Sequence, residues 1–176
     1  EAEVSYRQAI AENPNYAEIH YNLGNTLKEL EQLKEAEVSY RQAIAVNPDY
    51  TEAYSNLGLT LQDLDRLEEA EVVYRKAIAV NPDYAQAYSN LGVTLKELGR
   101  LEEAEVSYRE AIKIESNFIE AHNNLGVTLK DLGRSDEAEV IFRQTIEINP
   151  EFAEAYNNLG LTLQELGRLN EAEASY

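Results

Sequence analysis

The sequence predicts an all-α fold in which antiparallel helix pairs repeat along the chain. Glycine recurs at intervals of 34 residues, at Gly24, Gly58, Gly92, Gly126 and Gly160. The same interval, or a multiple of it, separates four copies of the dipeptide Asn-Pro, at 13–14, 47–48, 81–82 and 149–150. Because a segment of this length can bury its apolar face only against its neighbours, the repetition predicts a continuous array of helical repeats.

The composition restricts the kinds of partner. Among 176 residues, 15 Lys and Arg stand against 33 Asp and Glu, which gives a formal charge of −18. Such a chain repels phosphate backbones, so we expect no nucleic-acid partner. No apolar run approaches the length of a membrane span, so we expect no membrane partner. A neutral or basic protein partner suits this charge. The absence of cysteine excludes disulfides and thiolate metal sites and leaves the compartment open, with the cytoplasm as the default.

Matching the chain to itself gives the repeat boundaries. Residues 1–10 match residues 35–44, so the chain begins in the second half of a repeat, without methionine, and it stops partway through another. We expect one array over 1–176, cut from a longer protein. Its predicted parts are a partial repeat with a second helix only at 1–16, complete repeats at 17–50, 51–84, 85–118 and 119–152, and a truncated repeat at 153–176.

Each complete repeat carries two apolar stripes with helical spacing, and positions are numbered here from the first residue of the repeat. The first stripe occupies positions 3, 4, 7, 11 and 14, and the second occupies positions 17, 20, 24, 27 and 28. Steps of three and four residues predict a helix that buries one face. In the repeat at 51–84 the second stripe consists of Leu67, Ala70, Tyr74, Ala77 and Ile78.

Turn-forming residues separate these predicted helices. Glycine closes the first helix at Gly99, Gly133 and Gly167, but Glu31 and Asp65 replace it in two repeats, which predicts a turn that is not uniform. Glu115-Ser116 replaces Asn-Pro before residue 119 and leaves the geometry of that turn open. A polar residue follows the proline position, with Glu or Gln three residues later, and four of the five instances predict a capping box. The leading residues of this pattern are Asn15, Asp49, Asp83, Asn117 and Glu151.

These residues resemble the tetratricopeptide repeat (TPR) family along the whole chain. In the repeat at 51–84 the matching residues are Tyr54, Leu57, Gly58, Ala70, Tyr74, Ala77 and Pro82. The resemblance implies a TPR solenoid whose helix pairs form a right-handed superhelix. It also implies that first helices line the concave face, so that ligand-binding residues are sought there. Thr145, which replaces an alanine of the pattern, is one departure.

Small residues and threonines recur at fixed places in the predicted helix pairs. Gly24 and Ala36 leave room for close packing of the two helices, with the aromatic residue at position 24 beside them. Tyr176 is the last member of that aromatic series. A threonine hydroxyl one turn after each position 6 is predicted to bond back to the carbonyl four residues earlier. These threonines are Thr26, Thr60, Thr94, Thr128 and Thr162.

Asparagine occupies position 6 of every first helix, at Asn22, Asn56, Asn90, Asn124 and Asn158. Inside a helix it costs about 0.5–0.7 kcal/mol relative to alanine, so five copies call for a reason. One hypothesis is a ladder of carboxamides, each donating one hydrogen bond to an extended peptide and accepting one from it. Such a groove resembles the TPR superhelix of O-linked N-acetylglucosamine transferases. The alternative is that each amide bonds the neighbouring repeat. Further candidates on the same face are Asn25, Asn123, Asn157, Lys28, Lys96 and Lys130.

A second TPR binding mode, the carboxylate clamp, is matched only in part. Asn25 and Asn56 fit its asparagine positions, but Tyr21, Gln86 and Asn90 occupy the positions of its cations. Without those charges an acidic peptide tail gains little. Most of the excess acid instead lies at the start of second helices, where carboxylates favour the helix dipole.

No pattern in the sequence predicts catalysis. His20 and His122 hold equivalent positions three repeats apart, which indicates packing roles and prevents both from reaching one metal. Acidic residues follow the repeat, whereas an active site requires one unrepeated constellation. We therefore expect no enzyme activity, no catalytic residue, no metal site and no cofactor in this chain.

Three functions fit these observations. The first is a protein-interaction scaffold that holds an extended peptide along the asparagines. The second is the substrate-recruiting arm of a larger enzyme, similar to a glycosyltransferase, whose catalytic domain lies outside these residues. The third is a structural spacer that assembles by end-to-end stacking of its open apolar ends.

Overall fold

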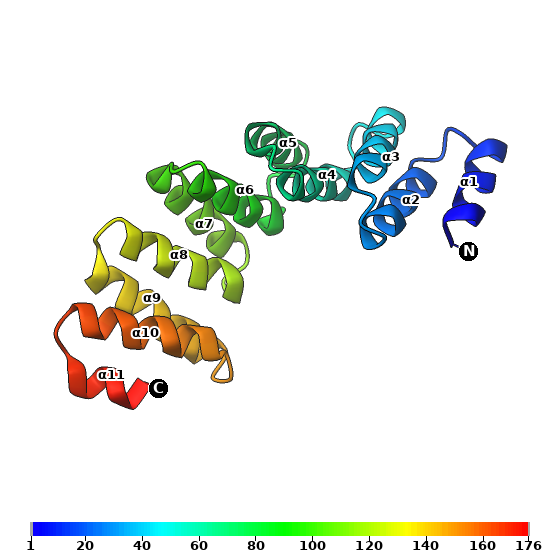
Figure 1. Cartoon of the computed structure of the whole chain (residues 1–176). Coiled ribbons are helices and arrows are strands. Elements are labelled where there is room, and N and C mark those ends of the chain that lie inside the picture. Colours follow the sequence, from blue (N-terminus) through cyan, green and yellow to red (C-terminus); the bar gives the residue numbers. More distant parts are fainter. Residues whose placement is uncertain (1, 176) are drawn as a thin grey trace. The chain divides into compact units, whose positions relative to one another are not determined.

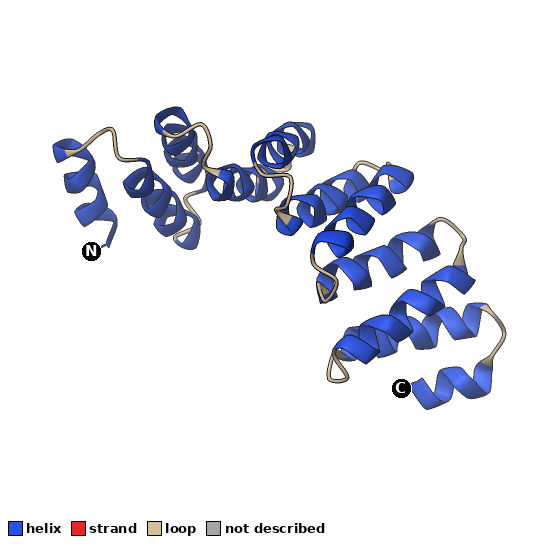
Figure 2. Ribbon diagram, turned by 180° about the vertical axis from the view of Figure 1, so that it is seen from behind, coloured by secondary structure: helices blue, strands red, loops and turns tan. Residues whose placement is uncertain are grey.

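The computed structural model describes residues 2–175, and these residues form helices joined by short turns, with no strand among them (Figures 1 and 2). Glu1 and Tyr176, the last residue of the predicted aromatic series, lie outside the described residues. The helices are α1 (Ala2–Glu12), α2 (Ala17–Glu29), α3 (Leu33–Val46), α4 (Thr51–Asp63), α5 (Leu67–Val80), α6 (Ala85–Glu97), α7 (Leu101–Ile114), α8 (Ile119–Asp131), α9 (Ser135–Ile148), α10 (Ala153–Glu165) and α11 (Leu169–Ser175). The prediction of an all-α fold built from helix pairs is confirmed.

The chain divides into two compact units, Glu1–Asn90 and Leu91–Tyr176, and the boundary falls inside α6. In the first unit α2 packs on α3 and α4 packs on α5, while the first helices α2 and α4 also touch. In the second unit α8 packs on α9 and α10 packs on α11, and the first helices α8 and α10 touch. Each unit therefore repeats one arrangement of consecutive helix pairs.

Close packing of the two helices of a pair explains the glycines at position 8. A Cβ atom added to Gly58 would lie 2.5 Å from Cε1 and Cζ of Tyr74, well inside van der Waals contact. Gly24 meets Tyr40, Gly92 meets Tyr108 and Gly126 meets Phe142 in the same way. All four rings are completely buried. The predicted close approach of glycine and aromatic ring is confirmed in these four repeats.

The turn between the two helices of a pair has the same backbone in every repeat, although its sequence varies. Gly99, Gly133 and Gly167 have φ near +75°, and Glu31 and Asp65 adopt the same left-handed conformation with φ of 59° and 58°. The hydrogen bonds agree: the N–H of Gln32 donates to Leu27 O at 2.8 Å, and the N–H of Arg168 donates to Leu163 O at 2.9 Å. This is the Schellman motif. The expectation of a non-uniform turn was wrong, because the motif holds two non-glycine residues in it.

The predicted capping boxes were wrong as well. The residue before the first helix is aromatic, at Tyr16, Tyr50, Phe118 and Phe152, and its side chain makes no capping hydrogen bond. Asn15, Asp49, Asn117 and Glu151 each stand one residue too early to cap these helices. The aromatic residue occupies the cap position because it packs: the Tyr50 ring lies 4.9 Å from the Tyr21 ring, centroid to centroid.

The loop between repeats is fixed by its backbone and by an asparagine side chain. Oδ1 of Asn47 accepts a hydrogen bond from the N–H of Asp49 at 3.1 Å, and Asn149 and Glu151 repeat this contact at 3.0 Å. Glu115 replaces the asparagine before α8, yet its φ of −127° and ψ of 94° match the −129° and 95° of Asn47. The turn geometry is thus kept without Asn-Pro.

Candidate functional site

One face of each first helix remains open to solvent, and we call it the open stripe. In α8 it runs through Glu120, Asn124, Val127, Lys130 and Asp131, whereas the residues between them are buried. In α4 the same positions 2, 6, 9, 12 and 13 are exposed or partly exposed. Four rows of side chains are therefore defined on the first helices: an acidic row at position 2, an asparagine row at position 6, an apolar row at position 9 and a charged row at positions 12 and 13. Two members depart from this pattern: Asn90 is buried in the asparagine row, and Asn25 replaces the apolar residue in α2.

Three members of the asparagine row, Asn56, Asn90 and Asn158, bond to the preceding first helix. Nδ2 of Asn56 donates to the Tyr21 hydroxyl at 3.1 Å and to Oδ1 of Asn25 at 2.9 Å. Nδ2 of Asn158 donates to Oδ1 of Asn123 at 3.0 Å, and Nδ2 of Asn90 lies 3.4 Å from Oγ of Ser55. Each of these partners at position 5 lies 35 residues earlier than the asparagine. The carboxamide nitrogens therefore link neighbouring first helices.

The carboxamide oxygens are used differently from the nitrogens. Oδ1 of Asn90 accepts from Nε2 of Gln86 at 2.9 Å. Among the described residues, none donates a hydrogen bond to Oδ1 of Asn56 or Asn158, and both residues are partly exposed. Since both N–H groups of Asn56 already have protein acceptors, its remaining capacity is to accept. An amide with this orientation presents an acceptor to the open stripe.

The threonine prediction is confirmed and adds to the order of the asparagine row. Threonine hydroxyls donate to the backbone carbonyl of the asparagine four residues earlier, at 2.7–3.1 Å. The pairs are Thr26 with Asn22, Thr60 with Asn56, Thr128 with Asn124 and Thr162 with Asn158. The backbone of the row is therefore held by the turn that follows it.

Asn25 connects the asparagine row to the core of the first unit. Its Oδ1 accepts from the Tyr40 hydroxyl at 2.8 Å as well as from Asn56. Burial raises the pKa of Tyr40, which keeps its hydroxyl a donor. Asn25, Lys28, Glu29, Tyr40 and Asn56 line an open cavity of about 430 Å³. The open stripes of α2 and α4 are therefore hollowed beside this pair of asparagines.

The lysines of the charged row are paired with acids of the next repeat. Nζ of Lys28 lies 3.2 Å from Oδ2 of Asp63, and Nζ of Lys96 lies 3.2 Å from Oδ2 of Asp131. Nζ of Lys130 lies 3.1 Å from Oε1 of Glu165. Each pair joins position 12 of one first helix to position 13 of the next. Lys28, Lys96 and Lys130 thus join neighbouring helices in the structure.

The remaining candidate asparagines fall into two groups. Asn123 is 3% exposed, donates to Oε1 of Glu154 at 2.8 Å and accepts from Asn158, so we assign it a positioning role and not a ligand contact. Asn157, at the same position of the last first helix, is exposed. Asn22 and Asn124 are partly exposed on the open stripes of α2 and α8.

The two histidines make packing contacts, as predicted. Nε2 of His20 lies 2.8 Å from the Pro14 carbonyl oxygen, and Nε2 of His122 lies 3.0 Å from the Ser116 carbonyl oxygen. A carbonyl only accepts, so Nε2 carries the proton in both rings. Within residues 2–175, no group of three or more His, Asp or Glu side chains is placed to hold a metal ion. No helix in this range is long and apolar enough to cross a membrane.

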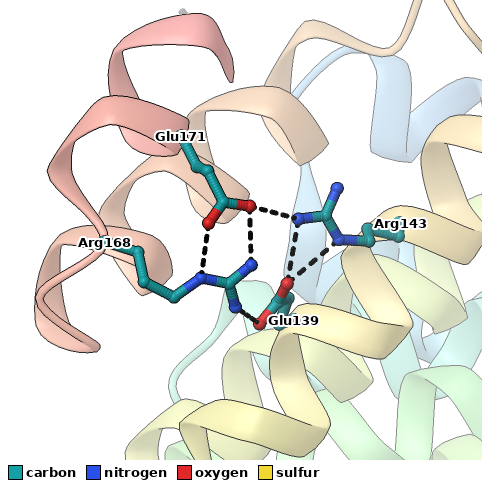
Figure 3. A network of polar contacts seen from close by, with 4 residues as sticks. All are labelled: Glu139, Arg143, Arg168 and Glu171. Atoms are coloured by element: carbon teal, nitrogen blue, oxygen red, sulfur yellow. Dashed lines mark hydrogen bonds and ion pairs between the residues drawn. The ribbon is translucent and has the colours of Figure 1, made fainter.

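Ion-pair networks on the second helices were missed by the sequence reasoning (Figure 3). Nε and Nη2 of Arg168 donate to the two carboxylate oxygens of Glu171 at 2.8 and 2.6 Å, and Nη1 donates to Glu139. Arg143 closes the network through Glu139 at 2.9 Å and Glu171 at 3.6 Å. Two further networks have the same design, namely Glu37, Arg41, Arg66 and Glu69, and Glu105, Arg109, Arg134 and Glu137.

These networks correct the interpretation of the acids at the start of second helices. Hydrogen bonds from Arg168 lower the pKa of Glu171, and those from Arg66 lower the pKa of Glu69. Burial raises the pKa of Glu37, but the bonds from Arg66 and Arg41 together outweigh it and leave that pKa below its ordinary value. The acids therefore serve as partners of arginines between repeats, beyond any effect on the helix dipole. The signal was present, because all four positions recur at 34 residues.

Comparisons with known proteins agree with this architecture. Family models described as "Tetratricopeptide repeat" match residues 5–38, 49–115, 119–152 and 141–174, and one described as "TPR repeat" matches residues 24–65. A search of curated proteins found no match.

Solved structures with the same fold cover nearly the whole chain. YrrB, described as a TPR protein with an unusual peptide-binding site, is 25% identical with a TM-score of 0.78, over 97% of this chain and 88% of that chain. A thermophilic TPR protein of Thermus thermophilus is 25% identical with a TM-score of 0.70, over 92% and 88%. The type IV pilus biogenesis factor PilW is 22% identical with a TM-score of 0.85, over 98% and 80%. With helix pairs, glycine–aromatic packing and family models that together match most of its length, the chain belongs to the tetratricopeptide repeat family.

Proposed function

We propose that the chain is a protein-interaction scaffold whose asparagine row holds the backbone of an extended peptide segment. One observation carries the proposal: Nδ2 of Asn56 and Asn158 is bound to the preceding helix, while Oδ1 accepts no hydrogen bond from a described residue and the side chain is partly exposed. Membership of the TPR family supports the general function of a protein-interaction scaffold. YrrB, at 25% identity, is described as binding peptide.

The inter-repeat bond favours peptide binding because it orients the amide before the ligand arrives. A free asparagine loses rotamer freedom when it binds, at a cost of about 0.5–1.5 kcal/mol for an ordered side chain. In Asn56 and Asn158 that ordering already exists in the unliganded chain. The two hypotheses for the row are therefore compatible. In Asn56 and Asn158 the nitrogen serves the neighbouring repeat, and the oxygen is available to a peptide N–H.

The charge of the open stripes favours a neutral or basic partner. Lys28, Lys96 and Lys130 are each neutralised by an acid of the next repeat. Position 2 adds four glutamates and one glutamine, at Glu18, Glu52, Gln86, Glu120 and Glu154. An acidic segment would gain nothing from the paired lysines and would be repelled by the glutamates.

The test is a pair of triple substitutions at Asn56, Asn90 and Asn124. Replacement by Ala removes the oxygen acceptor and the NH2 donor of each side chain, whereas replacement by Asp keeps the oxygen acceptor and removes the donor. A library of displayed peptides is selected on the unchanged protein, and the affinity of the selected peptides is measured by calorimetry. We expect the Ala variant to lose at least tenfold in affinity. The Asp variant should lose less, because it keeps the acceptors although it loses the bonds that order them.

The matched control replaces exposed asparagines outside the row. Asn15, Asn117 and Asn170 are exposed and lie on turns or on a second helix. Their combined replacement by Ala should leave the affinity within twofold. The ladder would be ruled out if the selected peptides bound the Asn56, Asn90 and Asn124 Ala variant as tightly as the unchanged protein. Circular dichroism checks that the variant is folded.

A second candidate, end-to-end assembly, stays a hypothesis. Sedimentation velocity over a hundredfold range of concentration tests it, and a sedimentation coefficient that does not change over this range would oppose it.

The third candidate, the recruiting arm of an enzyme similar to a glycosyltransferase, uses the same open stripe and stays a hypothesis. The sequence of the complete gene decides it.

A further inference from the structure

The apolar row indicates which side chains the ligand carries, in addition to the backbone that the asparagine row would hold. Leu161 of α10 is 39% exposed, whereas its neighbours Leu159 and Leu163 are buried with the core. Val127 of α8 and Val93 of α6 hold the same position 9 in the second unit and are partly exposed. A line of exposed apolar side chains beside hydrogen-bonding amides is typical of an interaction surface.

The row lies at a defined distance from the asparagine row. Position 9 follows position 6 by three residues, which is about 4.5 Å along a helix axis. Position 2 precedes position 6 by four residues, which is about 6 Å in the other direction. A peptide backbone that crosses the helices over Asn124 and Asn158 therefore has apolar side chains close on one side and carboxylates on the other.

The spacing along the row is set by the packing of neighbouring first helices. In the second unit, α8 and α10 touch and are joined at two levels, by Asn158 with Asn123 at 3.0 Å and by Lys130 with Glu165 at 3.1 Å. Both links join positions that differ by one between consecutive repeats, so the two helices run side by side with a small offset. Packed helices lie about 8–10 Å apart, and Val127 and Leu161 are therefore separated by about this step.

The spacing between neighbouring first helices matches the side-chain repeat of one extended conformation better than that of another. In a β-strand, side chains on one side recur every two residues, or about 6.7 Å, which falls short of the helix spacing by about 2 Å at every step. In a polyproline II segment they recur every three residues, or about 9.3 Å, which matches the spacing. Polyproline II has no internal hydrogen bonds, so its N–H groups remain available to the asparagine oxygens.

The charges around the apolar row indicate which side chains the ligand carries between its apolar residues. On the open stripes of α8 and α10, Asp131 is paired with Lys96 and Glu165 with Lys130. The carboxylates of Glu120 and Glu154, at position 2, have no lysine partner among the described residues. A basic side chain between the apolar ones reaches the acidic row. Unlike charges across an interface favour encounter and orientation.

We propose that the ligand is a basic segment of another protein in the polyproline II conformation, with an apolar side chain at every third residue placed on Val93, Val127 and Leu161. This inference rests on the proposed function, since it assumes that the asparagine row holds the backbone. It adds the conformation, the three-residue period and the charge of the partner.

The probes are three synthetic 12-residue peptides. The first has four copies of the triplet Val-Lys-Pro, the second has the same composition with its four valines adjacent, and the third has Glu in place of Lys. Calorimetry at low salt should show the first binding at least tenfold tighter than the second and the third. If the first two peptides bind with equal affinity, the three-residue period is overturned. If that binding is also lost in the Asn56, Asn90 and Asn124 Ala variant, the ladder is still supported.

The protein variants locate the contact. We expect the double substitution Val127→Asn and Leu161→Asn to weaken the first peptide about tenfold. The matched control is Val106→Asn with Val140→Asn, because these valines are 63% and 54% exposed on second helices of the same unit. The control should change affinity less than twofold. Equal losses in both double variants overturn the inference, and so does failure of the first peptide to bind. The ladder is judged separately, by the affinity of the library-selected peptides for the Asn56, Asn90 and Asn124 Ala variant.

Discussion

Nδ2 of Asn158 donates a hydrogen bond to Oδ1 of Asn123, 35 residues earlier and on the neighbouring first helix, at 3.0 Å. Because the repeat is 34 residues long, this bond joins position 6 of one repeat to position 5 of the one before. The same offset of one position appears where Lys130 meets Glu165. The contacts between repeats thus connect positions that are not equivalent in the repeat.

Replacing Asn123 by Ala should destabilise the protein, because Asn123 is buried and its removal leaves Asn158 and Glu154 without their partner. We expect a loss of about 1–3 kcal/mol in the free energy of unfolding, measured by urea denaturation. Asn157 is the control, since it holds the same position but is exposed. Its replacement by Ala should cost less than about 0.5 kcal/mol. Similar losses at the two positions would contradict the positioning role of Asn123.

Replacing Gly126 by Ala should also destabilise the protein. The added Cβ would lie 2.5 Å from Cε1 of Phe142, and this ring is completely buried. Overpacking of this kind costs about 1–3 kcal/mol. The control is a double-mutant cycle with Phe142→Leu, in which the smaller side chain admits the methyl group. The two losses should then sum to more than the loss in the double variant, and strict additivity would show that the ring is not the cause.

Replacing Glu31 or Asp65 by Gly should stabilise the protein. Both residues hold left-handed backbone conformations, with φ of 59° and 58°, which cost an L-residue about 1–2 kcal/mol and glycine almost nothing. We expect each substitution to raise the free energy of unfolding by about 1 kcal/mol in thermal or urea unfolding. The converse change Gly99→Ala is the matched control. No atom lies within 4 Å of the added Cβ there, so its expected loss of similar size isolates the backbone effect.

The arginine–glutamate networks should make stability depend on pH. The pKa values of Glu69, Glu137 and Glu171 are lowered in the folded chain, first of all by hydrogen bonds from arginine. The unfolded chain therefore binds more protons in the acid range. The stabilisation is present above the unfolded pKa, about 4.3 for glutamate, and is lost as the pH falls through the folded values.

The triple substitution of Arg66, Arg134 and Arg168 by Gln tests this pH dependence. The melting temperature should fall at pH 7, and the difference from the unchanged protein should shrink as the pH drops below the folded pKa values. Lys34→Gln with Lys76→Gln removes two exposed positive charges outside the networks and measures the effect of each lost charge by itself, against three charges lost in the triple variant. The melting temperatures of the triple variant and the unchanged protein are compared from pH 7 to pH 3. If their difference stays constant over this range, the networks do not cause the pH dependence.

Much of the fold could be predicted because the features that define it lie within one repeat. Gly24 with Tyr40, and Thr26 with Asn22, are contacts inside one helix pair or one helix turn, so a 34-residue period together with helical spacing locates them. The cap residues were misassigned because sequence rules score side-chain hydrogen bonding, while Tyr50 occupies its place through packing on Tyr21. The conformation of Glu31 was missed because local propensity favours glycine there, and only the surrounding Schellman bonds maintain it.

The period, the helix pairs and the asparagine row could be read from the sequence, and the resemblance to TPR proteins indicated the face on which a ligand is sought. Which atoms of the row are used between repeats, and which are left open, became clear only from the folded chain. The physical reason is that the offset between neighbouring first helices depends on how two helices pack, and a repeat length contains no information about it. For this reason Asn56 and Asn158 could be predicted as a row, but the division of each amide into a bound nitrogen and an open oxygen could not.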